Sequence, residues 1–261
     1  ILIQEGIMNN FINLSCSKLN SLVSEDDSYL KPASLVKNPN PEMPLIDAIC
    51  TRRTARTYSK KLVPYDVFSW IVKMSLNASS ACNEQNWKII CIDDRKIIDE
   101  LYHRGSASFL KKTNQCFFVC YNNESDNTEW DDDVQSGAAF VSTFSLIAHT
   151  VGVGTCWVGH LPNRSEIKRM FSMHSNYKPI ALVSYGYYSS GVKMKPRKRS
   201  SQDVIFMNSF DSSSLNFRDK KKIRFRHFLR YVYYKTPFFI RKYLKKYTTK
   251  YEKKFYYESF D

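Results

Sequence analysis

Three guanidinium groups and a hydroxyl gather within five consecutive residues of this chain. The segment TRRTARTYS contains Arg52, Arg53, Thr54 and Arg56, directly after a stretch that fits a short helix. Arginine presents a planar, permanently charged fork that matches phosphate oxygens, so the segment can hold a phosphate group. A solvated basic loop explains the same residues. A second basic cluster, in residues 193–199, follows the last apolar strand and can converge on the same anion.

A second stretch, SSACNEQNW (79–87), combines small residues with side-chain amides. Ser80, Asn83 and Gln85 offer hydrogen-bond donors and acceptors to a polar heterocycle. Their small neighbours would let such a ring close on the backbone. An ordinary turn held by local side-chain hydrogen bonds is the competing interpretation.

The third stretch, GVGTCWVG (152–159), places glycines around Trp157. Glycine permits a flat ring to approach the backbone closely, so that exposed N–H groups can reach a ring nitrogen. The competing interpretation is a helix C-cap at Gly152 followed by the start of a strand. The segment lacks the GxGxxG spacing of a dinucleotide-binding turn. No Ser-His-Asp, Cys-His or metal-ligand spacing stands out, so redox chemistry would have to come from an organic cofactor.

Helices and short apolar strands alternate through the middle of the chain. Helices are expected from Pro44, from Pro64 and over 93–103, 133–151 and 163–171, and strands over 87–92, 116–121 and 179–185. This alternation predicts an α+β or α/β fold.

The expected helices differ in their apolar patterns. The helix over 133–151 is rich in small residues and apolar most of the way round, which predicts a buried helix that another backbone approaches closely. Apolar residues share one face of the first helix, and others are spaced for burial in the second: Leu45, Ile46, Ile49 and Cys50, then Val67, Trp70, Ile71, Met74 and Leu76.

The composition is that of a packed globule with a basic tail. The chain has 261 residues, 43% of them hydrophobic, and a net charge of +14. Residues 216–261 carry 15 Lys and Arg against 4 Asp and Glu, a net charge of +11, which leaves +3 for the rest. Seven scattered cysteines without zinc-like pairing favour a reducing cytosol. No apolar run reaches the ~18 residues of a membrane helix, and no signal peptide is visible.

Five segments, in order, resemble the signatures of the nitroreductase family of FMN-dependent oxidoreductases. They are RRTAR, ASSACNEQNW, GVGTCWVG, PIALVSYGY and PRKR. The resemblance covers about residues 44–206 and implies an α+β, three-layer α/β/α fold with a mixed, mainly antiparallel sheet. It also implies a homodimer with FMN in each interface. Residues 1–43 would then be an N-terminal extension and residues 207–261 a basic, aromatic, helical C-terminal extension.

The resemblance assigns the cofactor-binding residues Arg52, Arg53, Thr54, Arg56, Ser80, Asn83, Gln85, Trp157, Gly159, His160, Arg197 and Arg199. The first three would hold the phosphate with the last two. Arg56 would face the pyrimidine edge, where positive charge stabilises the reduced flavin. The Ser and amide side chains would come from the partner subunit or line the ring and ribityl chain. The backbone around Gly159 and His160 would lie near N5, and the helix over 133–151 would form the dimer core.

The expected function is hydride transfer from NAD(P)H, through FMN, to an electrophilic small molecule of the nitro, quinone or enone type. No catalytic side chain and no metal are expected. The alternative is a flavin-binding or inactive module of the same fold that docks through its basic tail. Departures from the family pattern at Ser79, Asn86 and Ser142–Thr143 motivate that alternative.

The tail interleaves aromatic and basic residues. Thr236–Pro237 is a helix start signal, and Phe239, Tyr243, Tyr247 and Tyr251 recur every four residues beyond it. A packing or dimer-wrapping extension with a solvated basic face ranks first. An anionic membrane surface ranks second, and nucleic acid third, since the body shows no nucleic-acid-binding motif. The expected location is the cytoplasm, with membrane association through the tail as its extension.

Overall fold

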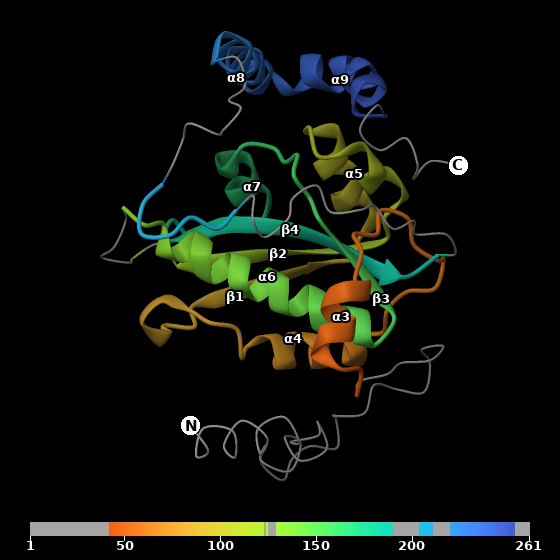
Figure 1. Cartoon of the computed structure of the whole chain (residues 1–261). Coiled ribbons are helices and arrows are strands. Elements are labelled where there is room, and N and C mark those ends of the chain that lie inside the picture. Colours follow the sequence, from red (N-terminus) through yellow and green to blue (C-terminus); the bar gives the residue numbers. More distant parts are fainter. Residues whose placement is uncertain (1–41, 123, 125–128, 190–203, 211–219, 254–261) are drawn as a thin grey trace, which may run out of the picture.

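The computed structural model describes residues 42–122, 124, 129–189, 204–210 and 220–253 (Figure 1). In chain order its elements are α3 (Leu45–Thr51), α4 (Tyr65–Ser75), η1 (Ala81–Asn83), β1 (Trp87–Ile92), α5 (Arg95–His103), η2 (Ser108–Lys112), β2 (Gln115–Asn122), α6 (Asp132–Thr150), β3 (Val153–Trp157), α7 (Arg164–Met170), β4 (Tyr177–Tyr187), α8 (Lys220–Lys235) and α9 (Phe238–Lys253).

The four strands form one sheet in the order β1-β2-β4-β3, and each neighbouring pair is antiparallel. The register places Trp87 opposite Tyr121 and Thr155 opposite Tyr185. One parallel bridge, between Thr54 and Thr155, adds the segment after α3 to the outer edge of β3. The sheet is therefore mixed and mainly antiparallel.

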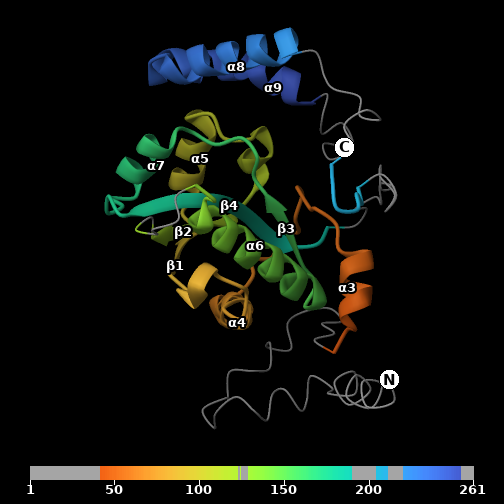
Figure 2. The same cartoon turned by 60° about the vertical axis from the view of Figure 1, so that its left-hand side comes forward.

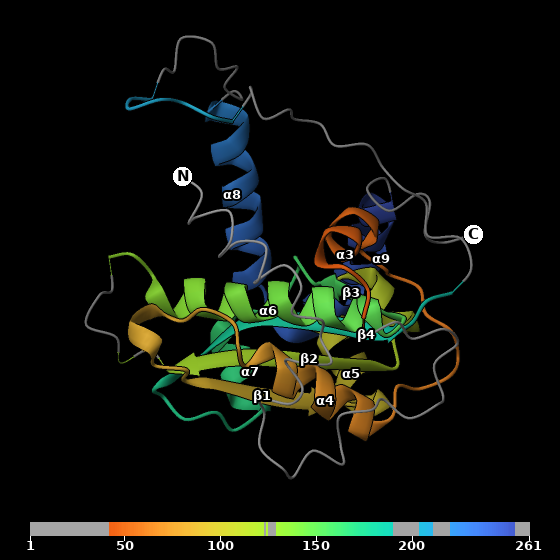
Figure 3. The same ribbon diagram turned by 60° about the horizontal axis from the view of Figure 1, so that its bottom comes forward.

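Helices cover both faces of this sheet. Helices α4 and α6 pack on one face, and α5 and α7 on the other (Figures 1 and 2); Figure 3 shows the α4–α6 side in front of the strands. Side chains of a strand alternate between faces, and β2 is apolar on both. Phe117 and Val119 enter the core under α4 and α6, whereas Phe118 and Cys120 enter the core under α5 and α7. The predicted three-layer α+β fold is confirmed.

Helix α6 approaches the sheet closely, as its small residues predict. A Cβ on Gly137 would lie 2.7 Å from the Cγ2 atom of Ile180 on β4, so a larger residue would push the helix off the strand. Further along, Phe144 packs against Phe117 with ring centroids 4.6 Å apart. This helix therefore forms the centre of the first core.

Parts of the apolar patterns are exposed in the single chain. The apolar face of α3 is exposed, with Ile46 at 69%, and Ala48 is the buried residue of this helix. Leu76, which directly follows α4 and was spaced for burial, is exposed as well. Helix α6 is buried along one side only, and Ser142 on its other side is exposed.

The C-terminal extension contains two helices. Helix α9 begins after Pro237, as the start signal predicts. Helix α8 was not predicted as a separate element of the expected helical extension. Both helices lie over α5 and α7, on the opposite side of the sheet from α6 (Figures 1 and 2). None of the helices in the described ranges is long and apolar enough to cross a bilayer.

Candidate functional site

The segment after α3, residues 52–58, is termed the arginine loop and is fixed to the sheet by its backbone. The Ala55 N–H donates to the Thr155 carbonyl at 3.0 Å, and Thr54 bridges Thr155 in parallel. Three residues later, Tyr58 forms an antiparallel bridge with Tyr188 at the end of β4. The loop therefore lies across the ends of β3 and β4 in a defined position.

Two glycines on the sheet make room for the arginine loop. A Cβ on Gly154 would lie 2.8 Å from the Ala55 Cβ, and one on Gly186 would lie 2.8 Å from the Tyr58 Cβ. Such separations are about 1 Å shorter than an ordinary contact between carbon atoms. At Gly154 the close approach is made by the protein's own loop, and the approach of a flat ring elsewhere in the GVGTCWVG segment stays a prediction. The predicted end of a helix at Gly152 is confirmed by its left-handed φ of 76° directly after α6.

The Tyr58 side chain strengthens this attachment. Its hydroxyl donates to the Ala55 carbonyl at 2.7 Å and lies 2.7 Å from the Ser184 Oγ. Burial raises the pKa of Tyr58 well above its usual value, so the hydroxyl stays neutral. The Tyr58 hydroxyl therefore links the arginine loop both to its own backbone and to Ser184 on β4.

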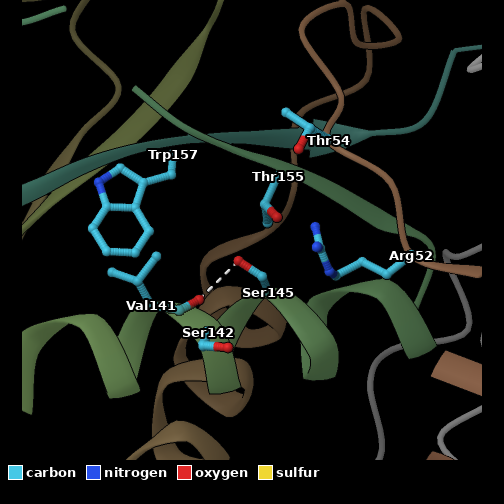
Figure 4. A pocket seen from close by; sticks show the side chains of 7 residues that line it. All are labelled: Arg52, Thr54, Val141, Ser142, Ser145, Thr155 and Trp157. Carbon is cyan, nitrogen blue, oxygen red and sulfur yellow. Dashed lines mark hydrogen bonds between the residues drawn. The ribbon is translucent and has the colours of Figure 1, made fainter. Parts of the chain in front are cut away.

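A pocket of about 260 Å³ opens between the arginine loop, β3 and α6. Seven residues line it: Arg52, Thr54, Val141, Ser142, Ser145, Thr155 and Trp157 (Figure 4). The Arg52 side chain extends from the loop toward Thr155 and Ser145, and the Trp157 ring stands at the other end over Val141 (Figure 4). The pocket thus has a cationic end, a wall of hydroxyl groups and an aromatic end.

The charge around this pocket favours an anion. Residues 48–65 contain five Lys and Arg and no Asp or Glu. One guanidinium nitrogen of Arg53 donates to the carbonyls of Cys50 and Arg52 at 2.7 and 2.6 Å. Its Nε atom is buried and has no hydrogen-bond partner within the described residues. Arg53 is not among the residues that line the pocket, but its unsatisfied donor belongs to the same cationic loop, and an anionic ligand suits such a loop.

His149 on α6 lies between Thr51, the last residue of α3, and Tyr188, which follows β4, a contact that sequence reasoning missed. Its Nε2 lies 2.8 Å from the Thr51 Oγ1, and its Nδ1 lies 2.9 Å from the Tyr188 hydroxyl. Tyr188 in turn donates to the Arg53 carbonyl at 3.5 Å. Burial, and then the charges of the two neighbouring arginines, lower the pKa of His149. No local signal links His149 to Thr51, because 98 residues separate them.

The SSACNEQNW loop is anchored on the first turns of α6. The Ala81 N–H donates to the Ser136 Oγ at 3.0 Å, and the Trp87 indole donates to the Ser136 carbonyl at 2.9 Å. Asn83 and Gln85 are exposed and bond to each other, from Nε2 to Oδ1 at 2.8 Å. Local hydrogen bonds therefore hold this loop within the single chain, and the binding of a ring by Ser80, Asn83 and Gln85 stays a prediction.

The same loop has an unusual backbone. Cys82, Asn83 and Gln85 all have left-handed φ angles, of 48°, 57° and 54°. For a residue with a Cβ this conformation costs about 1–2 kcal/mol, and such strain gathers at functional sites. The exposed amides therefore lie on a strained stretch of backbone.

A single chain separates the predicted residues into two groups. Arg52, Thr54 and Trp157 line the pocket, whereas Ser80, Asn83 and Gln85 do not. The amide loop is attached at Ser136, six residues and about 9 Å along α6 from the pocket residue Ser142.

Arg53, Arg56, Gly159 and His160 are not among the residues that line the pocket. Beyond β3, Gly159 has open space where a side chain would be. His160 is exposed, and its backbone carbonyl accepts a hydrogen bond from the Ala107 N–H at 3.1 Å. Arg197 and Arg199 lie outside the described residues. No group of three or more His, Cys, Asp or Glu within the described ranges is placed to hold a metal ion.

Comparisons with known proteins give a consistent result. The family model described as the nitroreductase family matches residues 49–141 and 101–187. A protein of Archaeoglobus fulgidus named "Putative NADH dehydrogenase/NAD(P)H nitroreductase" is 27% identical over 143 residues, which are 53% of this chain and 82% of that protein.

Solved structures share the fold. An FMN-dependent nitroreductase from Clostridium difficile R20291 is 22% identical, with a TM-score of 0.54, over 63% of this chain and 99% of the other. A nitroreductase-like family protein from Bacillus cereus is 18% identical, with a TM-score of 0.55, over 64% of this chain and 97% of the other. The arginine loop, the SSACNEQNW loop and β3 all fall within the matched residues. The chain therefore belongs to the nitroreductase family, whose members are oxidoreductases.

Proposed function

We propose that the protein is an FMN-dependent oxidoreductase that passes hydride from NAD(P)H to an electrophilic small molecule of the nitro, quinone or enone type. One observation carries the proposal. The arginine loop is fastened to β3 and β4 so that Arg52 and Thr54 face a pocket lined by hydroxyl groups and ended by Trp157. Membership of the nitroreductase family and the likeness to a structure described as an FMN-dependent nitroreductase support the same cofactor.

The residues present suit a flavin mononucleotide. The phosphate would bind Arg52, Arg53 and Thr54, where the buried Arg53 Nε lacks a partner among the described residues. Arg197 and Arg199 are proposed to join them, and Ser142 and Ser145 offer hydroxyl groups along the same wall. Arg56 is proposed to face the pyrimidine edge of the ring.

When bound, FMN supplies the electron-transfer chemistry by accepting hydride from a nicotinamide and passing it on. The residues of the chain have a positioning and electrostatic role. The cationic loop stabilises negative charge on the cofactor, because a fixed guanidinium needs no reorganisation during the reaction. Trp157 forms the aromatic end of the pocket, and the backbone around Gly159 and His160 is proposed to lie near the flavin N5.

The site is proposed to be completed by a second copy of the chain. The pocket holds about 260 Å³, less than the roughly 300–1,000 Å³ of ordinary cofactor sites. Leu45, Ile46 and Ile49 expose an apolar face on α3, which borders the pocket through the arginine loop. A partner that covers α3 and the exposed side of α6 would bring its own amide loop, with Ser80, Asn83 and Gln85, toward the cofactor.

The test measures FMN binding and oligomeric state together. We expect the purified apoprotein to be a dimer by light scattering and to bind one FMN per chain by titration. Ile49→Glu should produce a monomer and abolish FMN binding, because it introduces a charge into the proposed interface. Phe239→Glu is the matched control, since Phe239 is an exposed apolar residue on α9, away from α3. A wild-type protein that takes up no FMN would refute the proposed cofactor.

A dimer that binds FMN but is not oxidised or reduced by any nicotinamide or acceptor would favour the alternative of an inactive interaction module. The domain boundaries at residues 43 and 206, and a cytoplasmic location, remain predictions.

A further inference from the structure

Helices α8 and α9 are fastened to the body of the protein by buried cations. Arg241 is only 3% exposed and forms an ion pair with Glu166 on α7. It also donates to the Arg104 carbonyl at 3.2 Å. Lys245 is buried as well and donates to the Ser106 carbonyl. These contacts hold α9 against α5 and α7 and fix its orientation on the body of the protein.

Helix α8 is attached through its aromatic residues. The Tyr234 hydroxyl donates to the Leu161 carbonyl at 2.8 Å, and the Asn163 side chain donates to the Tyr234 carbonyl at 3.4 Å. The Tyr233 side chain lies against Gly105, and its hydroxyl oxygen is 3.4 Å from the position that a Cβ on Gly105 would take. Both helices therefore use one side to pack on the body.

The other sides of these helices expose a large apolar surface. Phe225, Phe228, Leu229 and Val232 follow the i, i+3, i+4, i+7 spacing of one helical face and are all exposed. On α9 the exposed residues Phe239, Tyr243 and Tyr247 recur every four positions, with Phe239 at 72%. Scattered exposed apolar residues are ordinary, but a contiguous apolar helical face signals an interaction surface.

This exposed surface is strongly basic. Residues 220–253 contain 13 Lys and Arg and one acidic residue, Glu252. Apart from the buried Arg241 and Lys245, the cations include exposed Arg224, Arg230 and Lys242, which lie among the apolar residues. We term the exposed side chains of α8 and α9 the basic-aromatic face. Its partner must accept both apolar insertion and a high density of positive charge.

We propose that the basic-aromatic face docks on the surface of an anionic lipid bilayer, with α8 and α9 lying along the interface. Amphipathic helices rich in Lys and Arg, with Phe and Leu on the other positions, bind membranes in this way. Neither helix can span the bilayer.

Two other partners fit this face less well. Nucleic acid would use the cations and rings but gives no role to exposed Leu229, Val232 and Ile240. A second basic-aromatic face would be repelled by its equal charge.

Docking through this face leaves the candidate pocket accessible. The pocket lies between β3 and α6, whereas α8 and α9 stand over α5 and α7 on the other side of the sheet (Figures 1 and 2). The proposal therefore does not depend on the cofactor or on the reaction.

The test is sedimentation of the full chain with vesicles of phosphatidylcholine alone or mixed with phosphatidylserine. We expect binding to the anionic vesicles only. The triple variant Arg224→Gln, Arg230→Gln and Lys242→Gln should weaken it on the order of 100-fold, at about 5-fold per charge near an anionic surface. The matched control removes three exposed charges from the body, Lys73→Gln, Lys88→Gln and Lys96→Gln, and should bind as the wild type does.

A second variant tests insertion of the apolar residues. Phe239→Trp should show tryptophan emission that shifts to shorter wavelength when anionic vesicles are added, because the indole enters a less polar medium. Tyr243→Ser with Tyr247→Ser should reduce binding without any change of charge.

Two outcomes would overturn the proposal. One is that the wild type does not bind anionic vesicles, and the other is that the triple variant binds them as tightly as the wild type does. Tight binding to single-stranded oligonucleotides without vesicle binding would assign the face to nucleic acid instead.

Discussion

Replacing Gly154 by alanine should displace the arginine loop. The added Cβ would lie 2.8 Å from the Ala55 Cβ and 2.8 Å from the Tyr188 ring. A comfortable separation between carbon atoms is about 3.5–4.0 Å, so the loop and β3 must move apart by about 1 Å. That movement would lengthen the 3.0 Å hydrogen bond from the Ala55 N–H to the Thr155 carbonyl.

The expected loss of stability follows from this clash. Overpacking of a filled contact costs about 1–3 kcal/mol. For a chain of this size, each kcal/mol lowers the melting temperature by roughly 2–4 °C. Gly154→Ala should therefore lower the melting temperature of the apoprotein by roughly 2–12 °C, and it should weaken FMN binding because Arg52 and Thr54 move with the loop.

Thermal unfolding of the apoprotein, followed by circular dichroism, checks the first effect, and FMN titration checks the second. Gly159→Ala is the matched control, since no atom lies within 4 Å of its added Cβ, and it should leave the melting temperature of the apoprotein unchanged. An unchanged melting temperature for Gly154→Ala would refute the argument that the sheet glycine makes room for the loop.

Three further predictions concern charged residues. Arg52→Gln should raise the Kd for FMN by about 10- to 100-fold, the effect of losing a charged hydrogen bond, and should leave riboflavin binding unchanged; equal losses for both ligands would contradict a phosphate contact. Burial is the main cause of the low pKa of His149 in the folded protein. The folded state is therefore most stable above pH ~6.5, the ordinary pKa of histidine, and it loses this stability as the pH falls through the folded-state pKa. The melting temperature of His149→Asn should fall less steeply below pH ~6.5, and a profile identical to the wild type would contradict the assignment. Arg241→Met should lower the free energy of unfolding in urea by about 3–5 kcal/mol, because it leaves Glu166 buried without its main cation; the double variant with Glu166→Leu should be more stable than the single one, and the reverse order would exclude an unpaired charge as the cause.

The sequence signals that succeeded were local ones. Continuous apolar runs predicted β1, β2 and β4 within a few residues, and the small-residue pattern predicted α6, because strand burial and helix packing act on neighbouring positions. The cationic character of the RRTAR segment was evident for the same reason, since its charges are adjacent in the chain.

Contacts between distant residues had no such signal. His149 meets Thr51 and Tyr188 only through the fold, and Gly154 faces Ala55 across two elements. The sequence places Leu45, Ile46, Ile49 and Cys50 on one face of α3, yet Ile46 is exposed. Spacing indicates that a helical face is apolar, but it does not indicate whether the chain itself or a partner covers that face.

An absorption spectrum of the purified protein, recorded before and after anaerobic addition of NADH and then NADPH, shows whether the chain is a flavoenzyme. We expect the visible bands of a bound flavin, at one FMN per chain, and their bleaching by at least one of the two nicotinamides. A colourless protein that also fails to take up added FMN would refute the proposed cofactor and reaction.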